Sequence, residues 1–593
     1  MSGGCFARLP QDILAVVDQY ISPEDRYSCL FVCRQWYPVF VVRHFKTVSL
    51  HGAQTCQQLS QEIHHDSRRY LEPQRDRLII PLAQLIKHLS IELETTDLEK
   101  SEDLPEQCCL LQSFRVSSLW TRSQKPIRTI DPTLWKLSRN LSRLELLVPQ
   151  LQKDATLTLL ASLPNLVEVD LNWICGPWTV YDMDAVHDSC RKLQSISVCA
   201  EMFLADNYDL ANLIRSSDSP KATTLQRFRL SIYSGLATRM ADWFAYAGRN
   251  YPQLEEFSLE ARPRHIVRSG IRSPAYDLLS MITSYKKGDQ QGKMLEVPTF
   301  LFFAKSCKHI HSLELLQLYL SRPLLAALFA SNLPIRHFGT TKAFAGLISE
   351  PDDNWFFHCT VQSLYLCTCT DMRLESIPFL DYFKGLRQLH IGMHDELCLR
   401  HVMACCKSLE HLTLENLSLA TREEDNTDNV CHQRLKSITF RSSVLPGCTL
   451  STAASYCPGL ESLHMEDCIV VDCCKTITHL NLSQSSLEHI SLQNIRKMHT
   501  SDKEGSSSRF KTRDGLPITI FGLEQEGVSI EQHWFDLSLS GRNDHGSRLL
   551  GLRPFEISLS SLIQRLQQDR MFAIAITCQK VANIHINRRR LLY

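Results

Sequence analysis

The sequence predicts an α/β protein in which a small helical module precedes a solenoid of short strand–helix repeats. Three observations support this prediction. The pattern apolar-x-x-apolar-x-apolar recurs along most of the chain, successive copies in its best region lie 23 to 26 residues apart, and the opening residues lack the pattern. Repeats of this length form a parallel β-sheet on the concave face of a solenoid and short helices on its convex face.

The opening segment, residues 9–40, is predicted to form short helices. Pro10 falls in the first turn of the first helix, where the N–H that proline lacks would have no partner. Ser22 then provides an N-cap and Pro23 the first residue of a second helix, and an apolar run leads to Trp36. A block of about 40 residues is too small to be stable alone, so we expect it to pack on the repeats or on a partner.

The first weak copies of the repeat pattern fall in residues 45–140. They are "FKTVSL" from Phe45, "IKHLSI" from Ile86 and "LQSFRV" from Leu111. The polar stretch "HGAQTCQQLSQEIHHDSRRYLEPQRDR" separates the first copy from the second and has no strand rhythm. We therefore interpret residues 45–140 as weak repeats and a linker.

The best copies of the pattern fall in residues 141–499. In "LEHLTL", the side chains of Leu409, Leu412 and Leu414 would point into a shared core, and the polar residues between them would point out onto the concave face. The segment before each strand, such as "TLTLLASLPN" before Leu166, is typical of a short helix. These copies begin at Leu141, Leu166, Leu193, Leu225, Leu254, Ile310, Val361, Leu386, Leu409, Leu435 and Leu460.

Four cysteines share one position in the repeat, three residues before the first apolar residue of the strand. A fixed register implies a fixed environment, here the packed corner where the helix turns into the strand. A small apolar side chain suits such a corner, so we expect buried, reduced thiols. The four are Cys190, Cys307, Cys406 and Cys457.

Two intervals inside the repeats depart from the period. A degenerate copy, "IRHFGT" from Ile335, fills the gap between Ile310 and Val361. The stretch of about 261–297 contains Gly, Pro and basic residues without strand rhythm, which indicates an insertion or a degenerate repeat.

The last part of the chain, residues 500–593, is predicted to hold a mobile loop followed by terminal repeats or a cap. The loop covers about 500–516 and is rich in Ser, Gly and charged residues. Two weak copies of the pattern follow it, "WFDLSL" from Trp534 and "VANIHI" from Val581.

The repeat pattern resembles the leucine-rich repeat, whose period is about 20–29 residues. The opening segment resembles an F-box, on the residues "LPQDIL" from Leu9 and "SPEDRYSCLFVCRQW" from Ser22. Asp12 stands where that family commonly has Glu, and Arg26 and Tyr27 stand where Asp-Leu is typical. The chain is thus similar to F-box proteins with C-terminal leucine-rich repeats.

The F-box resemblance covers residues 9–40 and implies a three-helix module within residues 1–44. Such modules bind a Skp-type adaptor, which joins them to a cullin in an SCF ubiquitin ligase. The resemblance implies adaptor contact through Leu9, Pro10, Ile13, Leu14, Leu30, Val32, Cys33 and Trp36.

The same resemblance implies a substrate-recognition subunit, whose repeats hold a protein substrate for ubiquitination. Two alternatives stay open: the module binds no adaptor and the repeats serve as an interaction scaffold, or the module is a cap over the first repeat. Four arginines within the 261–297 stretch suggest either a solvated loop or binding of a phosphorylated substrate. The expected concave-face contacts with substrate are Arg227, Arg229, Tyr365, His390, His411, Arg441 and His464.

Composition and motifs argue against several other classes of function. The 64 basic and 64 acidic residues give zero net charge, so we expect neither nucleic-acid nor anionic-membrane binding. No apolar run reaches membrane-spanning length, and the start lacks a signal-peptide pattern. None of the 23 cysteines forms a CxxC pair, so we expect no zinc knuckle. Because the cysteines are expected to be reduced and no signal-peptide pattern is present, we expect a location in the cytoplasm or nucleus.

No feature of the sequence indicates catalysis. There is no glycine-rich phosphate loop and no GxSxG motif, so we expect neither a catalytic residue nor a cofactor. Histidines are frequent on the predicted concave face, yet the register places His411 beside Ser437 and His464 beside Thr439. Since no three ligands converge, we expect no metal site.

Overall fold

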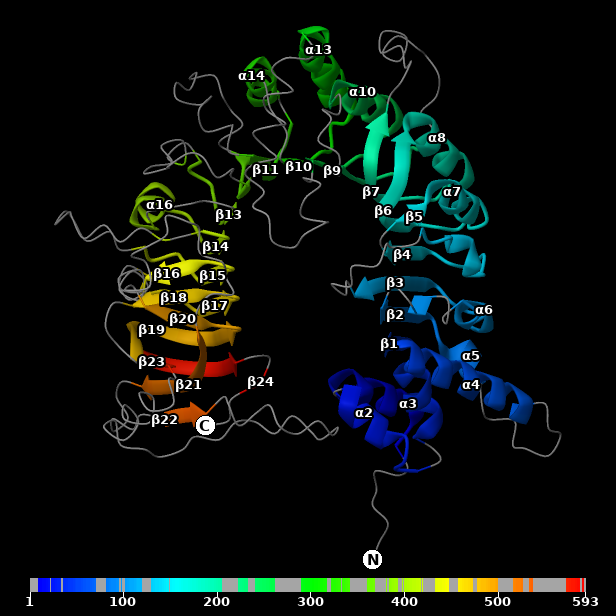
Figure 1. Ribbon diagram of the computed structural model, residues 1–593, viewed down its shortest axis with the longest axis horizontal. Coiled ribbons are helices and arrows are strands. Elements are labelled where there is room, and N and C mark those ends of the chain that lie inside the picture. The colour runs from blue at the N-terminus through cyan, green and yellow to red at the C-terminus, as the bar shows by residue number, and fades with distance from the viewer. Residues whose placement is uncertain are drawn as a thin grey trace, which may run out of the picture. The chain divides into compact units, whose positions relative to one another are not determined.

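The computed structural model divides the chain into two compact units, which are described separately (Figure 1). Unit 1 comprises Met1–Gly270 and Tyr285–Ile310, and unit 2 comprises Ile271–Ser284 and His311–Tyr593. The residues that the structure describes are 9–21, 23–33, 36–70, 81–94, 97–98, 102–119, 129–148, 150–204, 222–232, 240–261, 290–316, 322–331, 333–341, 360–367, 380, 383–392, 397, 399–417, 419, 432–446, 457–472, 477–499, 516–525, 533–536, 572–586 and 589–590.

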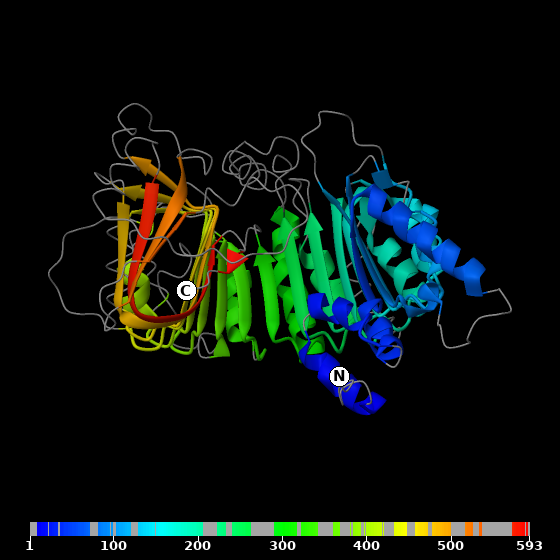
Figure 2. The same cartoon turned by 90° about the horizontal axis from the view of Figure 1, so that it is seen from below.

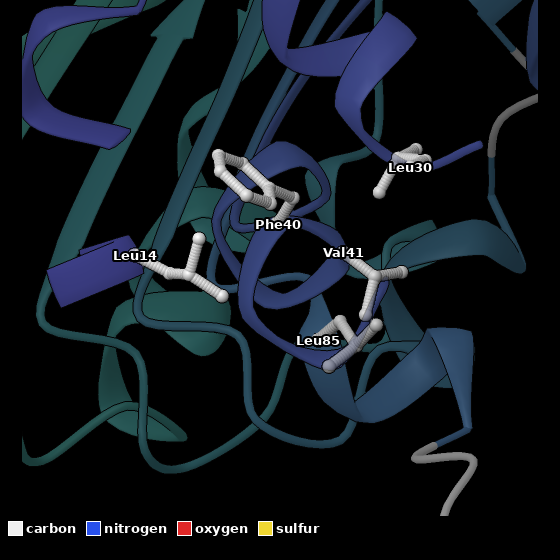
Figure 3. Packing of buried hydrophobic residues seen from close by; sticks show 5 residues of the cluster. All are labelled: Leu14, Leu30, Phe40, Val41 and Leu85. Carbon is white, nitrogen blue, oxygen red and sulfur yellow. The ribbon is translucent and has the colours of Figure 1, made fainter. Parts of the chain in front are cut away.

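Short helices form the start of unit 1. They are α1 (Gln11–Val17), the 3₁₀ turn η2 (Asp18–Tyr20), α2 (Pro23–Cys29) and α3 (Tyr37–His44). We call residues 9–44 the N-terminal module. Its core consists of Leu14, Leu30, Phe40 and Val41, which pack with Leu85 of α5 (Leu82–Leu85), as Figure 3 shows. The module therefore shares its core with the first repeat.

A buried carboxylate ties the helices of the module together. Asp18 is inaccessible to solvent and accepts hydrogen bonds from Arg26 Nε and Arg43 Nη1, each at 2.7 Å. Arg26 also donates to the backbone carbonyl of Ile21 at 3.4 Å. Since a buried charge is costly unless it is paired, this triad fixes the arrangement of η2, α2 and α3.

A parallel sheet follows the module in unit 1. One register line runs from Leu50 through Ile91, Val116, Leu146 and Leu171 to further apolar residues, all on the buried side. This alternation confirms the predicted strand phase. The strands, in sheet order, are β1 (Thr47–His51), β2 (His88–Glu94), β3 (Ser113–Leu119), β4 (Arg143–Leu147), β6 (Glu168–Thr179), β7 (Ser195–Leu204), β8 (Arg227–Ile232) and β9 (Glu256–Ala261). The short β5 (Leu151–Gln152) pairs with β6.

Helices cover the apolar side of the unit 1 sheet (Figure 1). Their bounds are α4 (Ala53–Tyr70), α6 (Leu104–Gln107), the 3₁₀ turn η4 (Pro132–Leu134), α7 (Lys153–Ala161), α8 (Val180–Ser189), α10 (Met240–Asn250) and α13 (Gln290–Ser306). We call the other side of each sheet, which carries the polar residues of the strands, its open face.

Two helices correct the sequence interpretation. The stretch interpreted as a linker contains the 18-residue α4, which buries Cys56 and Ile63, seven positions apart on one helical side. The predicted insertion at about 261–297 lies mostly outside the described residues, but its end, from Gln290, belongs to α13. That helix packs on α10 through Phe303, whose ring centroid lies 5.2 Å from that of Phe244.

The cysteines at the repeat corners are buried, as expected. Cys190 Sγ lies 3.5 Å from the carbonyl oxygen of Leu160, and Cys307 Sγ lies 3.3 Å from that of Tyr251. Burial raises the pKa of Cys190 to about 11 and that of Cys307 to about 12. These thiols are therefore protonated at neutral pH and serve as packing.

Unit 2 repeats the parallel arrangement. Leu389, Leu412, Ile438, Leu463 and Ile490 form one buried register line. Two short helices in this unit are α14 (Arg322–Ala330) and α16 (Leu399–Cys405). The strands of the sheet are β10 (Ser312–Leu316), β11 (His337–Thr341), β12 (Ser363–Cys367), β13 (Gln388–Gly392), β14 (His411–Glu415), β15 (Ser437–Arg441), β17 (Ser462–Glu466) and β19 (Ile477–Gln493).

The last repeats turn a corner after each strand. Asn416, Ser442, Asp467 and Asn494 have φ angles of 47° to 53°, and each is the second residue after the last buried strand position. Beyond these corners, β16 (Val444–Pro446), β18 (Ile469–Asp472) and β20 (Arg496–His499) form a second parallel sheet. Asn and Asp tolerate this left-handed backbone better than most residues, which explains their presence here.

The C-terminal strands do not follow sequence order. They are β21 (Leu516–Gln525), β22 (His533–Asp536), β23 (Phe572–Ile586) and β24 (Arg589–Arg590). β23 pairs in parallel with both β19 and β21, and Val581 stands opposite Leu487, as two repeat copies should. β22 pairs antiparallel with β21, so the copy expected from Trp534 is not a repeat strand. A hairpin needs only a short connection, whereas a parallel repeat needs a crossover.

Candidate interaction surfaces

The N-terminal module exposes an unusual amount of apolar surface. Of the eleven large apolar side chains that are exposed among the described residues, seven belong to this module. Tyr20 is 84% and Phe31 72% exposed. Clustered exposed apolar side chains are typical of a surface that binds another molecule. The seven are Ile13, Val16, Tyr20, Tyr27, Phe31, Val32 and Tyr37.

The structure separates the eight residues predicted to contact an adaptor into three groups. Pro10, Ile13 and Val32 are exposed, the last two at 46% and 55%. Leu14 and Leu30 are buried in the module core, so their contact with an adaptor stays a prediction. The remaining residues are half-buried at the margin of that core: Leu9, Cys33 and Trp36.

Sequence reasoning missed the aromatic part of this surface. The ring centroids of Tyr27 and Phe31 lie 5.2 Å apart, and that of His44 lies 5.5 Å from Tyr27. Burial first, and then the charge of Arg26, lowers the pKa of His44. The spacing of Tyr27 and Phe31, four residues apart, is the signal that could have placed both on one side of the chain.

The open face of unit 1 is a mosaic of arginines and carboxylates. Arg143 contacts Glu145 at 2.6 Å and Glu168 at 3.4 Å, and Arg115 contacts Glu145 at 3.4 Å. Arg227, a predicted substrate contact, reaches across β7 to Glu168 at 2.7 Å. Its charge is therefore already neutralised within the sheet.

Asp170 lies within this mosaic. Burial raises the pKa of its carboxyl group and the charge of Glu145 adds to the effect, whereas the hydrogen bond from Ser197 and the charge of Arg229 oppose it. Arg229, the second predicted contact of this unit, thus acts on a carboxylate of its own sheet. The basic residues of the predicted insertion, from Arg262 to Arg272, lie outside the described residues.

The open face of unit 2 brings three predicted residues into one cluster. The ring centroids of Tyr365 and His390 lie 4.4 Å apart, and His390 Nε2 lies 3.1 Å from Glu415 Oε2. Arg441, on the strand beside Glu415, contacts Glu466 at 3.4 Å. We call Tyr365, His390, Glu415, Arg441 and Glu466 the β12–β17 cluster.

The other two histidines predicted to contact substrate, His464 and His411, lie outside the cluster. His464 stands beside Thr439, as predicted, and its ring centroid lies 5.8 Å from that of His489. Burial, His489 and Arg441 lower the pKa of His464. His411 is exposed and lies beside Ser437 in another row, so the structure does not bring it into the cluster.

The hydrogen bond from His390 is the main cause of a lowered pKa at Glu415, and the charges of His390 and Arg441 assist it. Glu415 therefore remains a carboxylate at neutral pH. Within the described part of the chain, no three His, Cys, Asp or Glu residues are arranged to hold a metal ion. Among the described helices, none is both long and apolar enough to cross a membrane.

Comparisons with known proteins give little family information. No protein-family model matches the chain, and no curated protein does either. One matching solved structure is titled "Crystal structure of TLR13-ssRNA13 complex"; it has 11% sequence identity and a TM-score of 0.30. The match covers 69% of this chain and 64% of that one, so this chain spans less than two thirds of its length. The parallel strand register itself fits a leucine-rich-repeat solenoid.

Proposed function

We propose that the chain is the substrate-recognition subunit of an SCF-type cullin ubiquitin ligase. In this proposal the N-terminal module binds a Skp-type adaptor, and the repeats hold a protein substrate. The chain itself is non-catalytic and acts in the cytoplasm or nucleus. The leucine-rich-repeat-like fold, which suits a protein-interaction scaffold, supports the second half of this proposal.

One observation supports the first half more than any other. Exposed large apolar side chains concentrate on the module, although it is a small part of the chain. A module that served only to cover the first repeat would expose polar residues instead, since end caps need a polar outer face. The F-box-like sequence of this same segment gives the surface its expected partner.

A second candidate function is an interaction scaffold that binds no adaptor. Packing of the module core on Leu85 favours it, because that contact is what a cap over the first repeat would make. The two candidates differ in a single measurable property. Only the ligase subunit retains a purified Skp-type adaptor.

The test is a pull-down of a purified Skp-type adaptor by the full chain. The variant Ile13→Ser, Phe31→Ser, Val32→Ser removes three exposed apolar side chains and should lose binding. The control is Tyr181→Ser, which removes a side chain on α8 that is 60% exposed and outside the module. Circular dichroism checks that both variants stay folded. No capture by the wild-type chain would contradict the ligase proposal and leave the scaffold. Equal capture by all three proteins would show that the adaptor binds elsewhere than on these exposed apolar side chains.

A further inference from the structure

A glycine next to the β12–β17 cluster shapes the aromatic part of that cluster. Gly392 is buried on β13, and a Cβ atom there would lie 3.7 Å from Tyr365 Oη and 3.9 Å from Tyr365 Cε2. These are ordinary contact distances. The Tyr365 ring therefore lies against the space that a side chain at position 392 would occupy. A side chain larger than a methyl group at that position would displace the ring.

Charged and aromatic groups adjoin this ring on the next strands. The His390 ring, on β13, packs against the Tyr365 ring at an interplanar angle of 50°, and Glu415 stands directly beside Gly392 on β14. The carboxylate of Glu415 is held by His390, and its side chain keeps 34% of its surface exposed. Along this row the carboxylates of Glu415 and Glu466 flank the single guanidinium of Arg441, so negative charge is in excess.

We propose that Tyr365, Gly392 and Glu415 form a platform that binds an arginine or lysine side chain of the protein segment held by unit 2. The face of an aromatic ring attracts cations, and a neighbouring carboxylate pairs with them. The platform therefore selects a basic residue and repels an acidic one. This inference deepens the proposed function, because it assumes that the open face of unit 2 holds a protein.

The test uses N-acetyl-arginine amide as the probe and N-acetyl-citrulline amide as its neutral isostere. The full chain is labelled with ¹³C at histidine Cε1, and the His390 resonance, assigned with His390→Gln, reports on the platform at fixed pH. Arginine amide should shift this resonance saturably, whereas citrulline amide should bind about tenfold more weakly or not at all. Equal binding of the two probes would overturn the proposal.

Matched variants separate the parts of the platform. Glu415→Gln and Tyr365→Ala should each weaken arginine-amide binding about tenfold, and Tyr365→Phe should keep it. Gly392→Val should abolish binding by displacing the ring, whereas Gly392→Ala and the neighbouring Thr439→Val should leave it unchanged. Unchanged affinity in Glu415→Gln and Tyr365→Ala would overturn the proposal. Adaptor capture by the module is measured separately, so failure of the platform and failure of the ligase proposal are distinguishable.

Discussion

The open faces of units 1 and 2 share a backbone plan but differ in chemistry. In unit 1, Arg143, Arg227 and their carboxylate partners neutralise one another across strands. In unit 2, aromatic rings, imidazoles and hydroxyl groups dominate, and only a few charges accompany them. The comparison teaches that the buried leucines fix the strand register, while the exposed positions between them are left to define two different surfaces. Each prediction below tests one part of this difference.

The largest expected effect concerns what the two units share. Leu146 on β4 and Leu414 on β14 are both fully buried. Leu→Ala at either position should cost about 2–5 kcal/mol of unfolding free energy, since each change leaves a cavity. Denaturant unfolding of the full chain measures the loss. A loss much smaller in one unit than in the other would show that the cores under the two faces differ.

Breaking the ion pairs should affect unit 1 and depend on salt. Glu168→Gln removes the contacts of its carboxylate with Arg143 and Arg227, both of which are half exposed. We expect a loss of at most about 1 kcal/mol, smaller at high ionic strength. Thermal melts at low and high salt measure it. A salt-independent loss would mean that packing, not charge, holds this face.

Acidification should act in opposite directions at His464 of unit 2 and Asp170 of unit 1, whereas His44 and His88 of unit 1, whose pKa values are also lowered, should act as His464 does. Because the pKa of His464 is lowered in the folded chain, the unfolded chain binds this proton first, and unit 2 loses stability as pH falls below about 6.5. Because the pKa of Asp170 is raised, the folded chain binds that proton first. Unit 1 therefore gains stability as pH falls from the folded pKa towards about 3.9.

Hydrogen exchange, measured at a series of pH values and resolved by peptide, reports the stability of each unit separately. His464→Gln should flatten the pH dependence of unit 2 between about pH 6.5 and the folded pKa, and Asp170→Asn should flatten that of unit 1 at lower pH. Matching pH profiles in the wild type and in both variants would contradict the assignment of these two groups.

The smallest expected effect belongs to the outward positions. Thr413→Ala on β14 should change the unfolding free energy by no more than about 0.5 kcal/mol, because the side chain is half-buried on the open face. Leu412→Ala, one residue earlier, is the matched control and should cost several-fold more. The reverse ordering would mean that the strand phase is wrong.

The repeat body could be predicted in detail because its information is local. A pattern of six residues correctly predicts that Leu412 and Leu463 are buried, since burial alternates along a strand. The same pattern predicts Val581 as a repeat position, and Val581 is in register with Leu487. The pattern failed for Trp534, because apolar alternation does not encode strand direction. It also missed α4, a mostly polar helix that buries Cys56 and Ile63.

The two surfaces were predictable only in part. The F-box-like motif identified Ile13 and Leu14 together, but residue type alone could not show that the first is exposed and the second buried. On the open face of unit 2, the register predicted which residues lie outward. The bond between His390 and Glu415 runs diagonally between rows, so it depends on side-chain direction, which the register does not contain.

The corners after the strands of unit 2 determine where the chain can change its length. The spacing in sequence between the last buried residue of a strand and the left-handed residue after it is constant, as from Leu414 to Asn416 and from Leu492 to Asn494. From one corner to the next it varies: 26 residues separate Asn416 from Ser442, 25 follow to Asp467, and 27 more to Asn494. The repeats of this unit therefore differ in length between one corner and the next strand, and not between a strand and its own corner. A tag or reporter sequence inserted into this unit therefore belongs after the short strand that follows the corner, β16 or β18.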